Sequence, residues 1–268
     1  MPVIQAVVLG AVQGLTEFIP ISSSGHLVLV PEALGWDQPG LAFDVLLHAA
    51  SLIALLIYFS GELIDLTRGA LNGDRGSRRL VALLIIGNVP AAIAGLVWGD
   101  YFEQAFENAS AAAIQLGITA VILVAAELTL RYHQRRSANT GAAMRTMEDL
   151  NMLDATVVGV AQAVSILPGI SRSGSTIGAG LAMSVTRDDA ARFAFLLAIP
   201  ALFGAMILQL PKLDGASLGA AAGVGGFVSS LAFSYAAIWG LIRYLKRNTL
   251  YPFAAYCVIA GIVFYAIV

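Results

Sequence analysis

Residues 13–26 have the sequence QGLTEFIPISSSGH, a polar stretch with a proline in the middle of an apolar region that extends over residues 1–36. The apolar flank on either side is shorter than the ~20 residues that a helix needs to cross a bilayer. Proline and glycine inside a membrane segment are typical of a broken helix. The stretch therefore predicts a re-entrant helical hairpin, whose two short helices enter and leave the membrane on the same side.

A second interrupted apolar region lies at residues 153–184 and carries the sequence LPGISRSGST at residues 167–176. It predicts a second hairpin for the same reasons. A shift of 149 residues places polar residues of the first region on those of the second, which indicates an internal repeat. The matched pairs are Gly10/Gly159, Gln13/Gln162, Ile21/Ile170, Ser22/Ser171, Ser24/Ser173 and Gly25/Gly174.

The rest of the chain has the composition of a membrane protein. Of its 268 residues, 58% are hydrophobic and 12% are charged, outside the usual balance of soluble domains. The apolar runs are continuous rather than alternating, which excludes a transmembrane barrel. We therefore expect an all-α polytopic membrane protein with about six transmembrane helices and two re-entrant hairpins. The expected spans are 41–60, 80–99, 111–131, 190–210, 218–243 and 251–268.

The basic residues predict the orientation of these spans, because Lys and Arg near span ends stay in the cytoplasm. All but two of the 15 lysines and arginines, Lys212 and Arg172, fall in four segments that lie on one face if the six spans cross and the hairpins do not. Both chain termini are then extracytoplasmic. The residues of the four segments are Arg68, Arg75, Arg78, Arg79, Arg131, Arg135, Arg136, Arg145, Arg187, Arg192, Arg243, Lys246 and Arg247.

The two hairpins divide the chain, a single membrane domain over residues 1–268, into repeats at about 1–131 and 153–268, joined by a cytoplasmic loop at 132–152. Each repeat holds one hairpin followed by three spans. Because three is odd, the second repeat runs upside down relative to the first, the plan of proteins whose site lies between broken helices. The two polar loops then enter from opposite faces and meet near the midplane.

Two charged residues, Glu17 and Arg172, lie in or beside the polar stretches that interrupt the two regions. Gln13 and Glu17 are four residues apart and share one face of a helix, and a carboxylate at membrane depth is functional by default. Arg172 is the only Lys or Arg of either region, and a guanidinium can hold phosphate oxygens in a bidentate manner. A structural pair between Arg172 and Glu17 across the loops is compatible with that role.

The other polar residues of the loops complete a predicted phosphate site, to which His26 adds an imidazole. Helices that begin at hydroxyl-rich turns direct free backbone N–H groups at a bound anion. Since a carboxylate repels phosphate, Glu17 is either protonated or holds a divalent cation that bridges the two, and we favour the cation because hard metals commonly join carboxylates to phosphates. The expected substrate-binding residues are Gln13, Ser22, Ser24, Gly25, Ser171, Ser173, Gly174 and Thr176.

Several other features receive a structural interpretation. Asp44 and His48, at the start of a span, are assigned to packing or capping rather than to the cavity, and Glu127 to the membrane interface. The net charge of −2 gives no reason to expect nucleic acid. The glycine-rich residues 223–226 would allow close helix packing, within the chain or in a homodimer.

At its two polar loops the sequence resembles the undecaprenyl-diphosphate phosphatase family, also known as the bacitracin-resistance family. Its two signatures appear here as Gln13 to His26 and Pro168 to Thr176, and the resemblance covers essentially the whole chain. It implies two interlocked inverted repeats in the bacterial plasma membrane, dependence on Mg²⁺ or Ca²⁺, and bacitracin resistance. The implied reaction converts undecaprenyl diphosphate to undecaprenyl phosphate and inorganic phosphate at the extracytoplasmic side. Gln13 stands where many members have Glu.

Carried over by position, the resemblance implies that Glu17, His26 and Arg172 are essential, with Ser23 also catalytic. Ser23 and His26 are three residues apart and would share a helical face, so His26 either activates Ser23 or is itself phosphorylated. The sequence leaves both open. The alternative function is a polyprenyl-phosphate flippase with the same anion site. A carrier has little use for Glu17 together with His26, which favours the enzyme.

Overall fold

The computed structural model describes residues 1–105, 108–213 and 219–267. These residues are helical throughout apart from turns and one isolated bridge between Arg145 and Val185. The α-helices are α1 (Val3–Phe18), α2 (Ser23–Leu34), α3 (Leu41–Tyr58), α4 (Ser60–Leu71), α5 (Arg75–Val97), α6 (Gly99–Ala105), α7 (Ala109–Thr140), α8 (Met152–Val164), α9 (Arg172–Ala182), α10 (Arg187–Gln209), α11 (Ala220–Leu245) and α12 (Tyr251–Ile267). Two 3₁₀ turns, η1 (Met147–Asp149) and η2 (Leu210–Lys212), complete the described elements.

Five helices of the described part of the chain are long and apolar enough to cross a membrane, namely α3, α5, α7, α10 and α11. They coincide with the first five expected spans. The sixth expected span, 251–268, corresponds to α12, whose 17 residues stand at the lower end of the range that crosses a bilayer. The prediction of an all-α polytopic membrane protein is therefore confirmed.

Two helical segments extend beyond what hydropathy predicts. Helix α7 has 32 residues and ends only where Gly141 adopts a left-handed conformation, with φ of 73°. The first part of the expected 132–152 loop is therefore helical. Helix α4 has no buried residue and forms a short hairpin with α5, which begins at the N-cap Asp74. Both segments are polar, and a span search based on apolar runs does not detect them.

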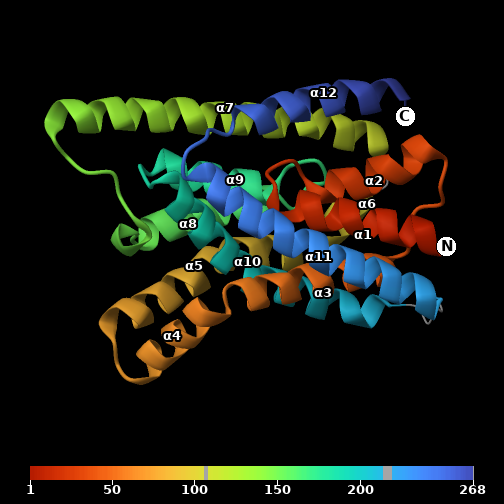
Figure 1. The fold of residues 1–268 in the computed structure, drawn as a ribbon, viewed down its shortest axis with the longest axis horizontal. Helices are drawn as coiled ribbons and strands as arrows, with labels where there is room; N and C mark the ends of the chain where they lie inside the picture. Colours follow the sequence, from red (N-terminus) through yellow and green to blue (C-terminus); the bar gives the residue numbers. More distant parts are fainter. Residues whose placement is uncertain (106–107, 214–218, 268) are drawn as a thin grey trace.

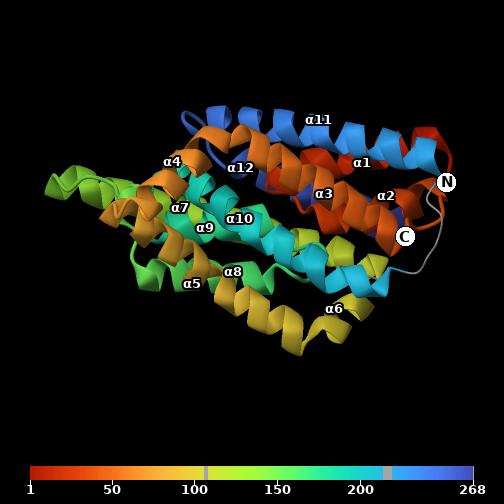
Figure 2. The same ribbon diagram turned by 90° about the horizontal axis from the view of Figure 1, so that it is seen from below.

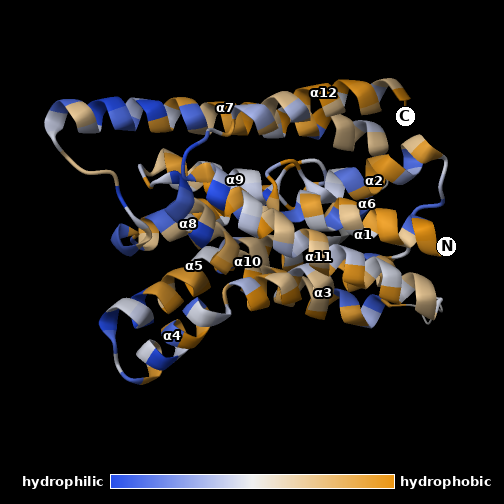
Figure 3. Ribbon diagram, viewed as in Figure 1, coloured by the Kyte–Doolittle hydropathy of each residue, from blue (hydrophilic) through white to orange (hydrophobic). Residues whose placement is uncertain are grey.

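The long helices run side by side, and both chain termini lie at the same end of the molecule (Figures 1 and 2). The opposite end holds the α4–α5 turn, the C-terminal end of α7 and the α11–α12 connection. These are segments to which the sequence assigns its basic residues. Figure 3 shows hydrophilic residues gathered at that end. The basic segments thus share one face, as the orientation argument requires.

Two pairs of short helices stand where the sequence predicts the hairpins, and their re-entrant path in a membrane stays a prediction. Helices α1 and α2 contain 16 and 12 residues, and α8 and α9 contain 13 and 11, so each is too short to cross alone. The element order is a short-helix pair and the long helices α3, α5 and α7, then a short-helix pair, the long helices α10 and α11 and the shorter α12, with α4 and α6 added to the first half. The repeat boundaries at 131 and 153 stay a prediction.

The two halves are interlocked, because the first hairpin packs on a helix of the second half and the reverse. Helix α1 lies against α11, where a Cβ added to Gly10 would come 2.3 Å from the Gly226 carbonyl oxygen. Helix α8 lies against α5, where a Cβ on Gly159 would come 2.3 Å from the Gly87 carbonyl oxygen. The matched glycines thus make matched backbone contacts. Because Gly226 packs against α1 inside the chain, residues 223–226 no longer argue for a dimer.

Packing holds the C-terminal end of α1 beside α10. Phe18 and Phe195 are both buried and meet edge to face, with ring centroids 5.4 Å apart. Phe59 of the α3–α4 junction contacts the same Phe195 ring at 6.4 Å. Aromatic pairs of this kind contribute about 0.5–1.5 kcal/mol beyond their buried area. The neighbouring Glu17 is therefore held by a rigid apolar cluster.

The basic end is fastened by two ion pairs. Arg145 pairs with Asp154 at the start of α8, with 2.5 Å between Nη2 and Oδ2. Glu127 of α7 binds Arg187 of α10 through two contacts of 2.8 and 2.6 Å, and it is fully buried. Glu127 thus lies inside the protein at its basic end, and its position at the membrane interface stays a prediction. Its carboxylate is kept in the interior because the Arg187 guanidinium neutralises it.

Candidate active site

The two polar loops meet inside the bundle, between the end of α1 and the start of α9. Ser173 Oγ donates a hydrogen bond to the Ile19 carbonyl oxygen at 3.3 Å. Arg172, the first residue of α9, forms an ion pair with Glu17 of α1. The predicted meeting of the loops is therefore found in the structure.

In the first loop, Ser22 is the N-cap of α2. Its Oγ accepts from the Gly25 N–H at 3.3 Å and lies 3.3 Å from Ser24 Oγ. Ser22 has a φ of 71°, a left-handed conformation that costs an L-residue roughly 1–2 kcal/mol. The cap and the loop contacts maintain that conformation.

In the second loop, Ser171 plays the same part for α9. Its Oγ accepts from the Gly174 N–H at 3.1 Å and lies 3.2 Å from Ser173 Oγ. Thr119 of α7 receives the Ser171 N–H at 2.9 Å and donates to the Gly169 carbonyl at 2.8 Å. The S-x-S-G match of the sequence is thus one capping motif used twice.

Glu17 is the centre of the site. Its side chain is 2% exposed and takes contacts from three elements. Gln13 Nε2 donates to Oε2 at 3.0 Å, Ser23 Oγ donates to the same oxygen, and Arg172 pairs with Oε1. His48 Nε2 of α3 lies 3.9 Å from Oε2. A buried carboxylate needs such partners, because each removes part of its desolvation cost.

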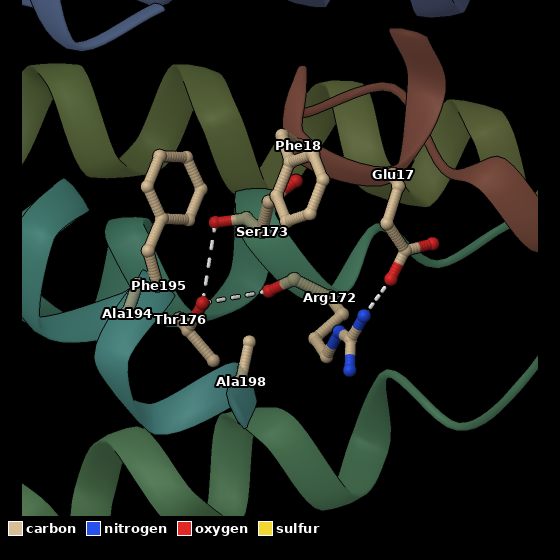
Figure 4. A pocket seen from close by; sticks show the side chains of 8 residues that line it. All are labelled: Glu17, Phe18, Arg172, Ser173, Thr176, Ala194, Phe195 and Ala198. Carbon is tan, nitrogen blue, oxygen red and sulfur yellow. Dashed lines mark hydrogen bonds and ion pairs between the residues drawn. The ribbon is translucent and has the colours of Figure 1, made fainter. Parts of the chain in front are cut away.

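Glu17 and Arg172 both line a small pocket (Figure 4). The pocket has a polar side formed by the loops and an apolar side formed by Phe18 and α10. Figure 4 shows Glu17 and Arg172 directed toward each other from α1 and α9. The lining residues are Glu17, Phe18, Arg172, Ser173, Thr176, Ala194, Phe195 and Ala198. This composition suits a ligand with a charged head and an apolar body.

Thr176 faces the start of its own helix. Its Oγ1 donates to the Arg172 carbonyl oxygen at 2.8 Å and contacts the Ser173 carbonyl oxygen at 3.3 Å. Thr176, like the capping serines, therefore supports the first turn of α9 in this structure. A role of these hydroxyls in binding substrate stays a prediction.

His26 lies away from the carboxylate. Its Nδ1 is 2.7 Å from the Ser22 carbonyl oxygen and its Nε2 is 2.8 Å from Tyr256 Oη on α12. Ser23 is bound to Glu17 instead. The structure therefore brings Ser23, Glu17 and Arg172 together, but it does not pair Ser23 with His26 as the three-residue spacing suggested.

The oxygen atoms around Glu17 fit a hard divalent cation. Gln13 Oε1 is buried and has no hydrogen-bond partner, because the amide nitrogen faces Glu17. Mg²⁺ is commonly held by one or two carboxylates together with substrate phosphates. The described residues contain no cluster of three or more His, Cys, Asp or Glu side chains. Gln13 and Glu17 would therefore hold a cation only together with the substrate.

His48 lies closer to the site than its assignment to packing or capping predicts. Its Nδ1 donates a hydrogen bond to the Asp44 carbonyl oxygen at 2.8 Å, and its Nε2 faces Glu17. Asp44 Oδ1 is also buried without a partner. The signal was present, because Asp44 and His48 have the same four-residue spacing as Gln13 and Glu17. Tyr256 gave no comparable signal.

These features define a class. The molecule is a polytopic helical membrane protein in which an arginine, a carboxylate and a serine hydroxyl meet between two loops, beside the N-termini of α2 and α9.

Comparison with known proteins gives the family. The chain belongs to the bacitracin resistance protein BacA family, whose model matches residues 6–263. A protein named undecaprenyl-diphosphatase from Methanosphaera stadtmanae is 39% identical over 98% of this chain and 97% of its own. Proteins of the same name from Gemmatimonas aurantiaca (40%, covering 99% and 98%) and Syntrophotalea carbinolica (41%, covering 100% and 99%) are similar to it as well.

Proposed function

We propose that this protein is an integral membrane phosphatase that hydrolyses undecaprenyl diphosphate to undecaprenyl phosphate and inorganic phosphate. The observation that carries the proposal is the contact of Ser23 with Glu17 beside Arg172. It supplies a hydroxyl, a proton acceptor and a fixed positive charge within one site. Membership of the family and the name that its similar members share support the same substrate.

The arrangement favours Ser23 as the nucleophile. Ser23 Oγ would attack the terminal phosphorus and pass its proton to the Glu17 carboxylate, to which it is already hydrogen-bonded. The bond between that phosphorus and the bridging oxygen then breaks, and undecaprenyl phosphate leaves. Water subsequently releases phosphate from the serine. Both ring nitrogens of His26 are engaged elsewhere, which disfavours His26 as the attacking group.

Charge stabilisation comes from the second loop. Arg172 and the N-termini of α2 and α9 offer donors to the phosphate oxygens, where charge accumulates during transfer. A Mg²⁺ or Ca²⁺ ion held by Glu17 and Gln13 would add positive charge at the diphosphate. When substrate enters, Arg172 would exchange part of its contact with Glu17 for the phosphate.

The proposed location is the bacterial plasma membrane, with the basic end in the cytoplasm. Both termini and the opening of the site would then face the extracytoplasmic side. Hydrolysis there would return the lipid carrier to cell-wall synthesis. It would also remove the diphosphate that bacitracin sequesters, which accounts for the property in the family name.

A flippase remains the alternative, because the interlocked halves and opposed hairpins also suit a transporter. Phosphate release from undecaprenyl diphosphate by the purified protein in detergent decides between them. The assay compares wild type with Glu17→Ala, Ser23→Ala and Arg172→Ala, with and without chelator. Release that all three changes abolish supports the phosphatase. No release from folded wild type in Mg²⁺ or Ca²⁺ would contradict it.

A further inference from the structure

The hydrogen bonds of His26 define its protonation. The Ser22 carbonyl oxygen can only accept, so the hydrogen of a neutral ring lies on Nδ1, 2.7 Å away. Nε2 then carries the lone pair, and the Tyr256 hydroxyl donates to it at 2.8 Å. The two rings are nearly parallel, with an interplanar angle of 14°. The imidazole is thus held from both sides, and it is 3% exposed.

The helix that carries Tyr256 is itself fixed against the first loop. Cys257, the next residue of α12, contacts the Pro20 carbonyl oxygen of that loop at 3.9 Å. One turn further, a Cβ on Gly261 would come 2.9 Å from the Ala113 carbonyl oxygen of α7. Phe264 meets the His26 ring edge to face at 6.0 Å. Tyr256 is therefore placed by α7 as well as by α12.

A chain of contacts leads from Tyr256 to the nucleophile of the proposed reaction. The Tyr256 hydroxyl donates a hydrogen bond to His26, and His26 donates one to the Ser22 carbonyl oxygen. Ser22 has the left-handed φ of 71°. That conformation sets the direction of the following residue, Ser23, whose hydroxyl reaches Glu17. Each link is a hydrogen bond or a peptide bond between described residues.

We infer that Tyr256 is a positioning residue for this site, which acts through His26 on the first loop and keeps Ser23 on Glu17. The inference rests on the proposed function for its kinetic consequence. Helix α12 would then also supply a polar group, the Tyr256 hydroxyl, that supports the first loop.

The experiment compares Tyr256→Phe with Tyr265→Phe, a matched change at a 58% exposed tyrosine of the same helix. Tyr256→Phe keeps the ring against His26 and removes only the hydroxyl. We expect kcat for undecaprenyl diphosphate to fall about three- to tenfold, the equivalent of one neutral hydrogen bond, with KM unchanged. Tyr265→Phe should match wild type in both constants.

A second readout separates positioning from general stability. The chain has three histidines, so ¹⁵N-histidine labelling gives few resonances, and His26→Asn assigns those of His26. The Nε2 resonance of His26 should move in Tyr256→Phe and stay in Tyr265→Phe. An unchanged Nε2 resonance, or an unchanged kcat, would overturn the inference. If wild type released no phosphate, the proposed function would fail, and the Nε2 resonance would still decide whether Tyr256 holds His26.

Discussion

The two polar loops share a capping motif and differ in chemistry. Ser22 and Ser171 cap their helices through the same two contacts. The residue after each cap, Ser23 in the first loop and Arg172 in the second, reaches Glu17. Glu17 belongs to the first loop only, and the 149-residue shift places it on the apolar Ile166.

That difference shows how a repeated frame becomes an asymmetric site. The frame supplies the N-termini of α2 and α9, whose first residues both contact Glu17, and helix N-termini favour bound anions. One loop then adds a carboxylate and a hydroxyl, and the other adds a guanidinium. Neither loop holds both the Ser23 hydroxyl and the Arg172 guanidinium, so each is incomplete without the other.

The largest expected effect concerns the residue that follows the cap, which is Ser23 in the first loop and Arg172 in the second. Ser23→Ala should lower kcat for undecaprenyl diphosphate by at least about 10³-fold, as expected for loss of a nucleophile. Ser24→Ala, in the next position of the same loop, should cost less than about tenfold because it removes one hydrogen bond. Phosphate release under saturating substrate measures both. Substantial activity in Ser23→Ala would exclude Ser23 as the nucleophile.

The equivalent position of the second loop should follow. Arg172→Lys keeps the charge but loses the planar fork of donors, and we expect a loss of about 10²–10³-fold in kcat/KM. Arg192→Lys, on a half-exposed ion pair with Glu62, is the matched control and should stay near wild type. Equal activity of Arg172→Lys and wild type would show that the second loop supplies only net charge.

A third comparison concerns the two matched glutamines. Gln13→Ala should raise the Mg²⁺ concentration for half-maximal activity about tenfold, because Gln13 orients Glu17 and offers a free oxygen beside it. Gln162 is bound to Asn88 of α5, so Gln162→Ala should leave the metal requirement unchanged. An equal shift in both variants would contradict a cation site in the first loop.

The smallest effect tests the caps. Ser22→Gly relieves a left-handed φ and should stabilise the protein by about 0.5–1 kcal/mol. Ser171 has a φ of −70°, and Ser171→Gly should cost a few tenths of a kcal/mol, since Gly is a poorer cap. Thermal unfolding in one detergent compares them. Shifts of the same sign would mean that the Ser22 conformation carries no strain.

The sequence predicted the frame well, because the frame follows from local signals. Pro20 and the Pro168-Gly169 pair interrupt apolar runs that are too short to cross, and the structure breaks both helices there. The pairing of Gln13 with Glu17 followed from helical spacing. The extension of α7 to Thr140 and the presence of α4 were missed, because these helical segments do not form a continuous apolar run.

The side-chain contacts of the site were less predictable. Ser23 and His26 have a spacing that permits contact, but their directions depend on Glu17 in one case and Tyr256 in the other. Tyr256 is 230 residues from His26 in the chain, and a tyrosine in an apolar helix gives no sign of its partner. The four-residue spacing that relates Gln13 to Glu17 also relates Asp44 to His48, so the same reasoning could have indicated His48.

The central claim is that the two loops form one catalytic site through Glu17 and Arg172. A double-mutant cycle on phosphate release from undecaprenyl diphosphate tests it most directly, with Glu17→Gln, Arg172→Gln and the pair. The account predicts that each single change removes nearly all activity and that the double variant is no worse than either. Independent, multiplying losses would contradict a shared site.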